Sequence, residues 1–232
     1  MDYEPLPRLY PIVDASFFAG SAAIVTFAKA LASAGCTVLQ YRNKSGNSRG
    51  MLDHARELRR SFPRLRDSHV SKPQRDPSPS HSRNSAGKEI SVRLIMNDRA
   101  DLCIAAEFDG VHVGQDDLSP QSVRMIVGPA RWLGVSTHNP EQLHAADLTS
   151  ADYVAIGPVF ATNTKERPDP VVGLAGVRQA RTLTRKPLVA IGGITRANAA
   201  SVIEAGADSV AVISDLLHEP GKSAEEFFRI LG

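Results

Sequence analysis

Eight short apolar segments recur along the chain, and stretches with helical spacing of apolar residues separate them. Several of the eight, among them TVLQY, YVAIGPV and SVAVIS, are almost wholly apolar. Such runs are typical of parallel strands that are covered on both faces of their sheet. The predicted strands are Leu9–Asp14, Thr37–Arg42, Arg93–Asn97, Gly110–Gly114, Trp132–Ser136, Tyr153–Val159, Pro187–Gly192 and Ser209–Ser214.

Helices are predicted between these strands. Ser119 and Asn139 each stand before a proline, and a capping residue followed by proline indicates the start of a helix. Eight strand–helix units predict one domain, residues 1–232, with the α/β fold of a (β/α)8 TIM barrel. The alternative is a doubly wound open sheet, which we disfavour because no GxGxxG motif follows the first strand. Helical spacing of apolar residues marks Ala22–Ser33, Gly50–Arg60, Ala175–Thr184 and Arg196–Ala205.

The stretch from Asp67 to Glu89 interrupts this pattern. It is rich in Ser, Pro and charged residues and has almost no apolar ones. It therefore cannot bury enough surface to offset the entropy lost when a chain is ordered. We interpret it as a flexible insertion between the second helix and the third strand, with a lid or a binding segment as the alternative. In a barrel its base would lie on the amino-terminal face, away from the expected active site.

Charge and cysteine content exclude several classes of protein. The formal net charge of +2 is too small to indicate nucleic acid as a partner. Cys36 and Cys103 have no metal-ligand spacing, which favours a reducing, cytoplasmic setting. No apolar stretch approaches the roughly 20 residues of a membrane span, and no signal peptide is recognised, so we expect no membrane partner.

Polar residues follow the carboxyl ends of the predicted strands, where a barrel of this kind places its active site. A single polar loop means little, but these residues would all fall on one rim. His112, inside the apolar run GVHVG, is expected to be a hydrogen-bonded core residue rather than a ligand. The rim residues are Gln40, Tyr41, Arg42, Asn43, Lys44, Asn97, Asp98, Gln115, Asp116, Asp117, Ser136, Thr137, His138, Thr162, Asn163, Thr164, Lys165, Gly192, Gly193, Ser214 and Asp215.

Two carboxylates on this rim predict a metal site. Asp98 follows the third strand and Asp117 follows the fourth, so the two side chains can face one point. Magnesium prefers one or two protein carboxylates together with phosphate oxygens and water. The alternative is that the aspartates cap the helices that follow them, and spacing alone does not separate Asp117 from Asp116.

Cations on the same rim suit a highly charged anion. Arg42, Lys44 and Lys165 can converge on a pyrophosphate, and Arg can bind it through two hydrogen bonds at once. Solvated surface charge is the alternative. A second anion site is expected after strands seven and eight, where backbone N–H groups can approach a phosphate closely. The residues of that second site are Gly193, Ile213 and Ser214.

Seven motifs together resemble the thiamine-phosphate synthase family: QYRNK, NDR, GVHVGQDD, GVSTH, GPVFATNTK, AIGGIT and GADSVAVIS. The resemblance covers nearly the whole chain outside the insertion. Members of the family are TIM barrels that join 4-amino-5-hydroxymethyl-2-methylpyrimidine diphosphate to thiazole phosphate. The products are thiamine phosphate and pyrophosphate, the reaction needs Mg²⁺, and the resemblance leaves a homo-oligomer open.

Motif matches imply the role of each residue. Mg²⁺ would bind Asp98 and Asp117, because the family pattern selects Asp117 over Asp116. The resemblance also implies a dissociative substitution that needs no protein nucleophile, with the charged groups stabilising the departing pyrophosphate. A related thiazole tautomerase and a non-catalytic, phosphate-binding thiamine sensor are the alternatives, which the complete set of cations and carboxylates disfavours. The pyrimidine diphosphate would be held by Gln40, Tyr41, Arg42, Asn43, Lys44, Asn97, Ser136 and Lys165, of which Arg42, Lys44, Ser136 and Lys165 would be catalytic, and the thiazole phosphate by Thr162, Asn163, Thr164, Gly193, Ile213 and Ser214.

Overall fold

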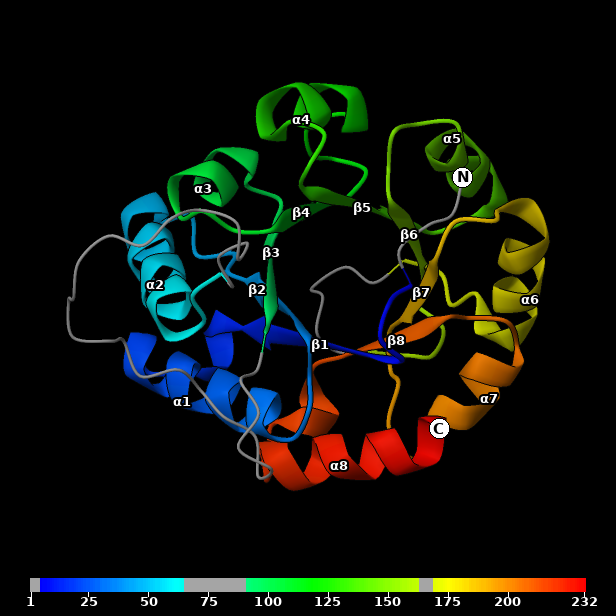
Figure 1. Ribbon diagram of the computed structural model, residues 1–232. Coiled ribbons are helices and arrows are strands. Elements are labelled where there is room, and N and C mark those ends of the chain that lie inside the picture. The colour runs from blue at the N-terminus through cyan, green and yellow to red at the C-terminus, as the bar shows by residue number, and fades with distance from the viewer. Residues whose placement is uncertain (1–4, 65–90, 163–168) are drawn as a thin grey trace, which may run out of the picture.

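Parallel strands close into a barrel in the computed structural model, which describes residues 5–64, 91–162 and 169–232. Within these residues the eight strands pair in chain order, and β1 pairs with β8 to complete the ring (Figure 1). This confirms the predicted (β/α)8 fold and excludes the open sheet. The strands are β1 (Leu9–Asp14), β2 (Val38–Arg42), β3 (Arg93–Asn97), β4 (Gly110–Val113), β5 (Trp132–Thr137), β6 (Tyr153–Ile156), β7 (Leu188–Ile191) and β8 (Ser209–Val212).

Helices surround the barrel (Figure 1). The predicted helix starts are confirmed, since the Ser119 and Asn139 side chains accept hydrogen bonds from the N–H groups of Ser122 and Gln142 at 3.2 and 2.9 Å. Each such cap contributes about 1 kcal/mol. The helices are α1 (Ser21–Ser33), α2 (Ser48–Ser61), α3 (Ala100–Ala105), α4 (Pro120–Val127), α5 (Pro140–Asp147), α6 (Gly173–Leu183), α7 (Ala199–Glu204) and α8 (Pro220–Leu231), with the 3-10 turns η1 (Ala15–Phe17) and η2 (Ser214–Leu216).

Two element boundaries differ from the prediction by three residues, each for a local reason. The helix predicted from Arg196 begins at Ala199, because the Asn198 side chain accepts from the Thr195 N–H at 2.8 Å and holds these residues in a turn. The sixth strand, predicted to reach Val159, ends at Ile156. Proline 158 follows, and proline has no N–H to donate to a strand ladder.

Side chains alternate along each strand between two apolar layers. Outward side chains form the larger core with the helices, where Leu31 of α1, Leu133 of β5 and Phe227 of α8 are fully buried. Burying one such side chain contributes on the order of 2 kcal/mol. The inward layer is smaller and contains two tyrosines. Its members are Tyr10, Ile12, Val38, Ile95, Tyr153, Ala155, Val189 and Ala211.

A repeated arginine–aspartate contact holds the amino-terminal face. Asp109, just before β4, accepts from the Arg59 guanidinium at 2.6 Å and from the Leu94 N–H of β3 at 2.8 Å. The Asp109 N–H in turn donates to the Leu94 carbonyl at 2.8 Å. We call this arrangement an aspartate clamp. It recurs at two further strand pairs, as Arg124–Asp152–Leu133 and Arg181–Asp208–Leu188.

The predicted insertion, Asp67 to Glu89, lies outside the described residues. Its described flanks, Arg64 and Ser91, line the same pocket at the amino-terminal face, together with Asp109 and Trp132. The chain therefore leaves and rejoins the barrel on the face that the sequence predicts. Within the described part of the chain, no helix combines the length and the apolar character needed to cross a membrane.

Candidate active site

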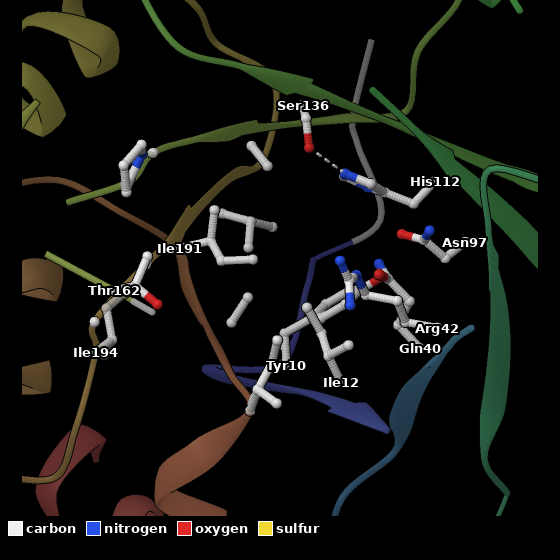
Figure 2. Close-up of a pocket in the computed structure, with 18 of the residues that line it drawn as sticks. Tyr10, Ile12, Gln40, Arg42, Asn97, His112, Ser136, Thr162, Ile191 and Ile194 are labelled. Atoms are coloured by element: carbon white, nitrogen blue, oxygen red, sulfur yellow. Dashed lines mark hydrogen bonds between the residues drawn. The ribbon is translucent and has the colours of Figure 1, made fainter. Parts of the chain in front are cut away.

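A pocket lies at the carboxyl-terminal face of the barrel, where the sequence places the site (Figure 2). Arg42 and Asn97 lie on one side of it, and Thr162 and Ile194 lie across from them in the same view. The pocket thus has a charged, polar end beside β2 and β3 and a second end beside the loops after β6 and β7. The predicted site residues that line it are Gln40, Arg42, Asn97, Ser136, Thr162, Gly193, Ile213 and Ser214.

Arg42 is held in place by a carboxylate from the neighbouring strand. The β1–β2 register sets Asp14 beside Arg42, and the two side chains form an ion pair. Asp14 is 2% exposed, and it also accepts from the Ser16 N–H at 3.0 Å and the Ser16 hydroxyl at 2.8 Å. These contacts hold the Asp14 carboxylate in place, so it fixes the Arg42 guanidinium, and Arg42 still lines the pocket.

Asp98 lies where two carboxylates and one ammonium meet. Its backbone has a φ of 62°, which is uncommon for a residue with a side chain, and its N–H donates to the His112 carbonyl at 2.7 Å. The Lys44 ammonium pairs with its carboxylate. Burial raises the pKa of the Asp98 carboxyl, Lys44 opposes this shift, and the neighbouring Asp117 carboxylate adds to it. Two carboxylates that disfavour each other's charge are a setting in which a divalent cation is stabilised.

The structure also separates the two candidate aspartates after β4. The Asp117 carboxylate accepts from the Gly114 N–H at 2.8 Å, and this turn directs it toward Asp98. Asp116 is exposed to solvent. Among the described residues, no three His, Cys, Asp or Glu side chains gather closely enough to hold a metal ion. A metal held by Asp98 and Asp117 would therefore take its other ligands from water and phosphate oxygens, as Mg²⁺ does.

Asn97 lines the pocket and has a buried donor without a partner in the described part of the chain. It is the last residue of β3, it is buried, and its Nδ2 has no hydrogen-bond partner among the described residues. Leaving such a group unpaired costs about 1–3 kcal/mol. A bound ligand with an acceptor atom at this point would remove that cost, so the Asn97 amide suits a substrate contact.

Hydrogen bonds between side chains continue below the pocket into the barrel interior. Gln40 Nε2 donates to Tyr10 Oη at 3.2 Å, and the hydroxyls of Tyr10 and Tyr153 lie 2.8 Å apart. The two ring nitrogens of His112 contact Tyr153 Oη at 3.1 Å and Ser136 Oγ at 2.8 Å. Burial lowers the pKa of His112 to about 4 and raises that of Tyr10 to about 12, so both groups are neutral near pH 7.

The other end of the pocket is built from tight loops. Gly192 and Gly193 have φ values of 102° and 62°, and a Cβ on Gly193 would lie 2.6 Å from the Ala161 carbonyl oxygen. Packing between the two loops therefore requires glycine here, whatever ligand is bound. Ile213 and Ser214 complete this end of the pocket, where η2 begins.

Comparison with known proteins identifies the family of this barrel. A family model described as thiamine monophosphate synthase matches residues 64–216. A protein named thiamine-phosphate synthase, from Koribacter versatilis (strain Ellin345), is 55% identical over 97% of this chain and 96% of its own. The chain belongs to the thiamine monophosphate synthase family. A relative of the same name from Chloroflexus aurantiacus is 39% identical over 89% of this chain and 83% of its own.

Solved structures place the thiamine monophosphate synthase fold among other barrels. Thiamine phosphate pyrophosphorylase from Pyrococcus furiosus superimposes with a TM-score of 0.75 at 26% identity, covering 97% of this chain and 95% of its own. A 3-hexulose-6-phosphate synthase from Salmonella typhimurium has a TM-score of 0.67 at 14% identity, covering 97% of this chain and 98% of its own. That second likeness concerns the fold alone.

Two residues of the QYRNK motif that the resemblance assigned to the site are not among those that line this pocket. Tyr41 points away from the pocket, and its hydroxyl contacts His54 of α2 at 3.0 Å. Asn43 donates to Tyr41 Oη at 3.0 Å and accepts from the Ser45 N–H at 2.9 Å, so both ends of its amide are used locally. For Tyr41 the reason is the period of two along β2, which turns every second side chain outward, whereas Asn43 follows the end of the strand. Asn163, Thr164 and Lys165 lie outside the described residues.

Several residues that line or support the thiamine monophosphate synthase pocket were missed in the sequence. Asp14 ends an apolar strand on the same rim, and that position could have indicated its role. Tyr10 and Tyr153 resemble packed core residues in the sequence, whereas the structure directs both into the pocket. His112 is buried and hydrogen-bonded, as expected, and it lines the pocket as well. His138, which the sequence already placed on the rim, lines the pocket too, and its Nδ1 contacts the Gly157 carbonyl at 2.6 Å.

Proposed function

We propose that this chain is a thiamine-phosphate synthase that joins a pyrimidine diphosphate to thiazole phosphate and releases pyrophosphate. One observation carries the proposal: the groups that this reaction needs lie in one pocket or beside it on the same rim, in a chain that matches a relative of that name over 97% of its length. They are a fixed arginine, Arg42, a carboxylate pair, Asp98 and Asp117, and the unpaired amide of Asn97.

The two ends of the pocket suit the two substrates. Gln40, Asn97 and Ser136 offer polar groups to the pyrimidine ring, and Arg42 suits the diphosphate attached to it. The opposite end would hold the thiazole phosphate. Its residues are Thr162, Gly193, Ile213 and Ser214. The motif match adds Asn163 and Thr164 to these contacts, and it adds Lys165 to the contacts of the pyrimidine diphosphate.

Asp98 and Asp117 fit a divalent cation. Both side chains offer oxygen ligands. Burial and the nearby Asp117 carboxylate raise the pKa of Asp98 because they disfavour its negative charge, and a cation between the two carboxylates would stabilise that charge. When bound there, Mg²⁺ would neutralise charge that develops on the departing pyrophosphate. The Lys44 ammonium, which contacts Asp98, adds positive charge to the same region.

The reaction follows from these placements. The bond between the pyrimidine methylene carbon and the diphosphate oxygen breaks, and its electron pair leaves with the pyrophosphate. Arg42, immobilised by Asp14, is already oriented toward that developing charge, so little reorganisation is needed as the bond breaks. The electron-rich aminopyrimidine stabilises the carbocation, and the thiazole nitrogen attacks it. Binding both substrates in one pocket supplies proximity, and no protein nucleophile takes part.

A product assay tests the proposal. The protein would be mixed with the pyrimidine diphosphate and thiazole phosphate, with and without Mg²⁺, and thiamine phosphate would be quantified. We expect product only with Mg²⁺, and a large loss in Asp117→Asn. The matched control is Asp116→Asn, which removes the same charge from the adjacent, exposed residue.

Two results would overturn parts of this proposal. Absence of product from folded protein that binds thiazole phosphate would favour the tautomerase or the sensor. Equal losses in Asp116→Asn and Asp117→Asn would show that general acidity of the loop matters, and not a ligand at Asp117.

A further inference from the structure

The hydrogen bonds beneath the pocket form a continuous chain, and its first member sets a direction. The amide nitrogen of Gln40 can only donate, so Tyr10 Oη accepts from it at 3.2 Å. Tyr10 has one hydroxyl hydrogen of its own. The Tyr153 oxygen, 2.8 Å away, is the partner that accepts it. Both tyrosines are 1% exposed, so solvent offers no competing partner.

The same reasoning fixes the state of His112. Tyr153 accepts from Tyr10, so its own hydrogen is donated to His112 Nδ1 at 3.1 Å. A neutral imidazole that accepts at Nδ1 carries its hydrogen on Nε2. That N–H then donates to Ser136 Oγ at 2.8 Å, a contact visible in Figure 2.

Ser136 is the last member of the chain and lines the pocket. Its oxygen accepts from His112, so its hydroxyl hydrogen stays available for another partner. We propose that Tyr10, Tyr153 and His112 are positioning residues that orient the Ser136 hydroxyl as a hydrogen-bond donor toward an acceptor atom of the bound substrate. Only the identity of that substrate, the pyrimidine diphosphate, rests on the proposed function.

Gly134 in β5 leaves the space in which the Tyr153 and His112 side chains of this hydrogen-bond chain meet. A Cβ on Gly134 would lie 2.1 Å from the Tyr153 ring and 2.4 Å from His112 Nδ1, closer than any non-bonded contact allows. The backbone of β5 therefore approaches the junction of the two side chains directly. A larger residue at this position would separate Tyr153 from His112 and break the chain at its centre.

Ring nitrogen spectroscopy tests the direction of the chain without any substrate. Full-length protein with ¹⁵N-labelled histidine would be examined by long-range ¹H–¹⁵N correlation near pH 7. The signals of His112 would be assigned as those that disappear from the spectrum of His112→Gln. We expect His112 to carry its hydrogen on Nε2. Tyr153→Phe should shift the ring nitrogens away from this state, and Tyr10→Phe should preserve it, because Tyr153 can still donate. A hydrogen on Nδ1 in the unsubstituted protein would overturn the proposal.

A kinetic cycle tests the role of the chain. Tyr153→Phe should lower kcat/KM about tenfold, the size of one lost neutral hydrogen bond. In a Ser136→Ala background the same change should cost little, because the oriented hydroxyl is already gone. Additive losses would contradict the proposal. The matched control is Thr137→Val, which removes a buried hydroxyl that donates to the Ala155 carbonyl at 2.7 Å and should show no coupling to Ser136→Ala.

The two readouts separate this inference from the proposed function. An Nε2 hydrogen on His112 in protein that makes no thiamine phosphate would support the proposed hydrogen-bond chain and contradict the proposed function. Product formation together with an Nδ1 hydrogen on His112, or with additive losses in the kinetic cycle, would support the proposed function and contradict the proposed hydrogen-bond chain.

Discussion

Arginine and aspartate meet at both ends of the barrel, but in different surroundings. At the amino-terminal face Asp109 accepts from Arg59, from Arg64 and from the Leu94 N–H, so its oxygens are fully engaged by the protein. At the carboxyl-terminal face the guanidinium of Arg42 pairs with a buried Asp14 and also lines the candidate active site.

The difference shows how one kind of ion pair serves two purposes. A pair that ends on backbone groups stabilises the fold, because removing one partner leaves the other buried and unpaired. A pair that leaves part of the cation facing a pocket holds a binding group in position. Substitutions at the two faces should therefore separate stability from turnover, and the following experiments can break or sharpen that contrast.

The largest effect is expected for Asp98→Asn. Turnover should fall on the order of 1000-fold, because a charge directed at the reacting groups is lost. The melting temperature should change little, since Asp98 contacts the exposed Lys44 rather than the core. Steady-state rates at saturating substrates and Mg²⁺, with a parallel melting curve, measure both. An unchanged rate would remove Asp98 from the site.

At the opposite face Asp109→Asn should reverse this outcome. The free energy of unfolding should drop by about 3 kcal/mol, because Arg59 loses its partner and the clamp on β3 is broken. The kcat of the remaining folded protein should stay near that of the parent. Urea titration checks the first value. Asp101→Asn, which removes an exposed carboxylate paired with Arg99, is the control and should cost little.

Asp14→Asn tests an intermediate case, since Asp14 contacts an active-site residue without lining the pocket itself. The Arg42 guanidinium should lose its fixed position, and kcat/KM should fall about tenfold. If unfolding free energy falls while kcat/KM is preserved, then Asp14 behaves like the aspartates of the other face, and the contrast drawn above fails for this pair.

The smallest effect is expected from replacing residues 67–89 with a short linker. The segment has almost no apolar residues, and its flanks Arg64 and Ser91 already line one pocket. The melting temperature should shift by less than about 4 °C, which corresponds to about 1 kcal/mol for a chain of this size. A larger drop would show that the segment contributes to the clamped face.

The barrel could be predicted from the sequence because its strands differ sharply from their surroundings. Runs such as those containing Leu94 and Val210 are apolar on both faces, and there are eight of them. The location of the rim also follows from the sequence, since a strand's carboxyl end is known once the strand is known. Within it, the period of two would have separated Gln40 and Arg42, which face inward, from Tyr41.

Contacts that depend on register could not be predicted. Asp14 meets Arg42 because β1 and β2 align at these residues, and nothing local to either strand contains that information. The hydroxyls of Tyr10 and Tyr153 meet across 143 positions of sequence. A buried tyrosine that bonds at such range has the same local pattern as one that only packs, so its polar role emerges only when the barrel closes.

The aspartate clamps also have a consequence for the accuracy of the distant pocket. In each clamp the aspartate accepts a hydrogen bond from the N–H of a leucine, and the residue three positions further along that strand lines the pocket. The pairs are Leu94 and Asn97, Leu133 and Ser136, and Leu188 and Ile191. A slip of one residue turns every side chain of a strand to the opposite face. The clamps prevent such a slip because they fix the register of each of these strands against its neighbour. Contacts at the amino-terminal face of the barrel thereby determine which side chains line the pocket at the carboxyl-terminal face.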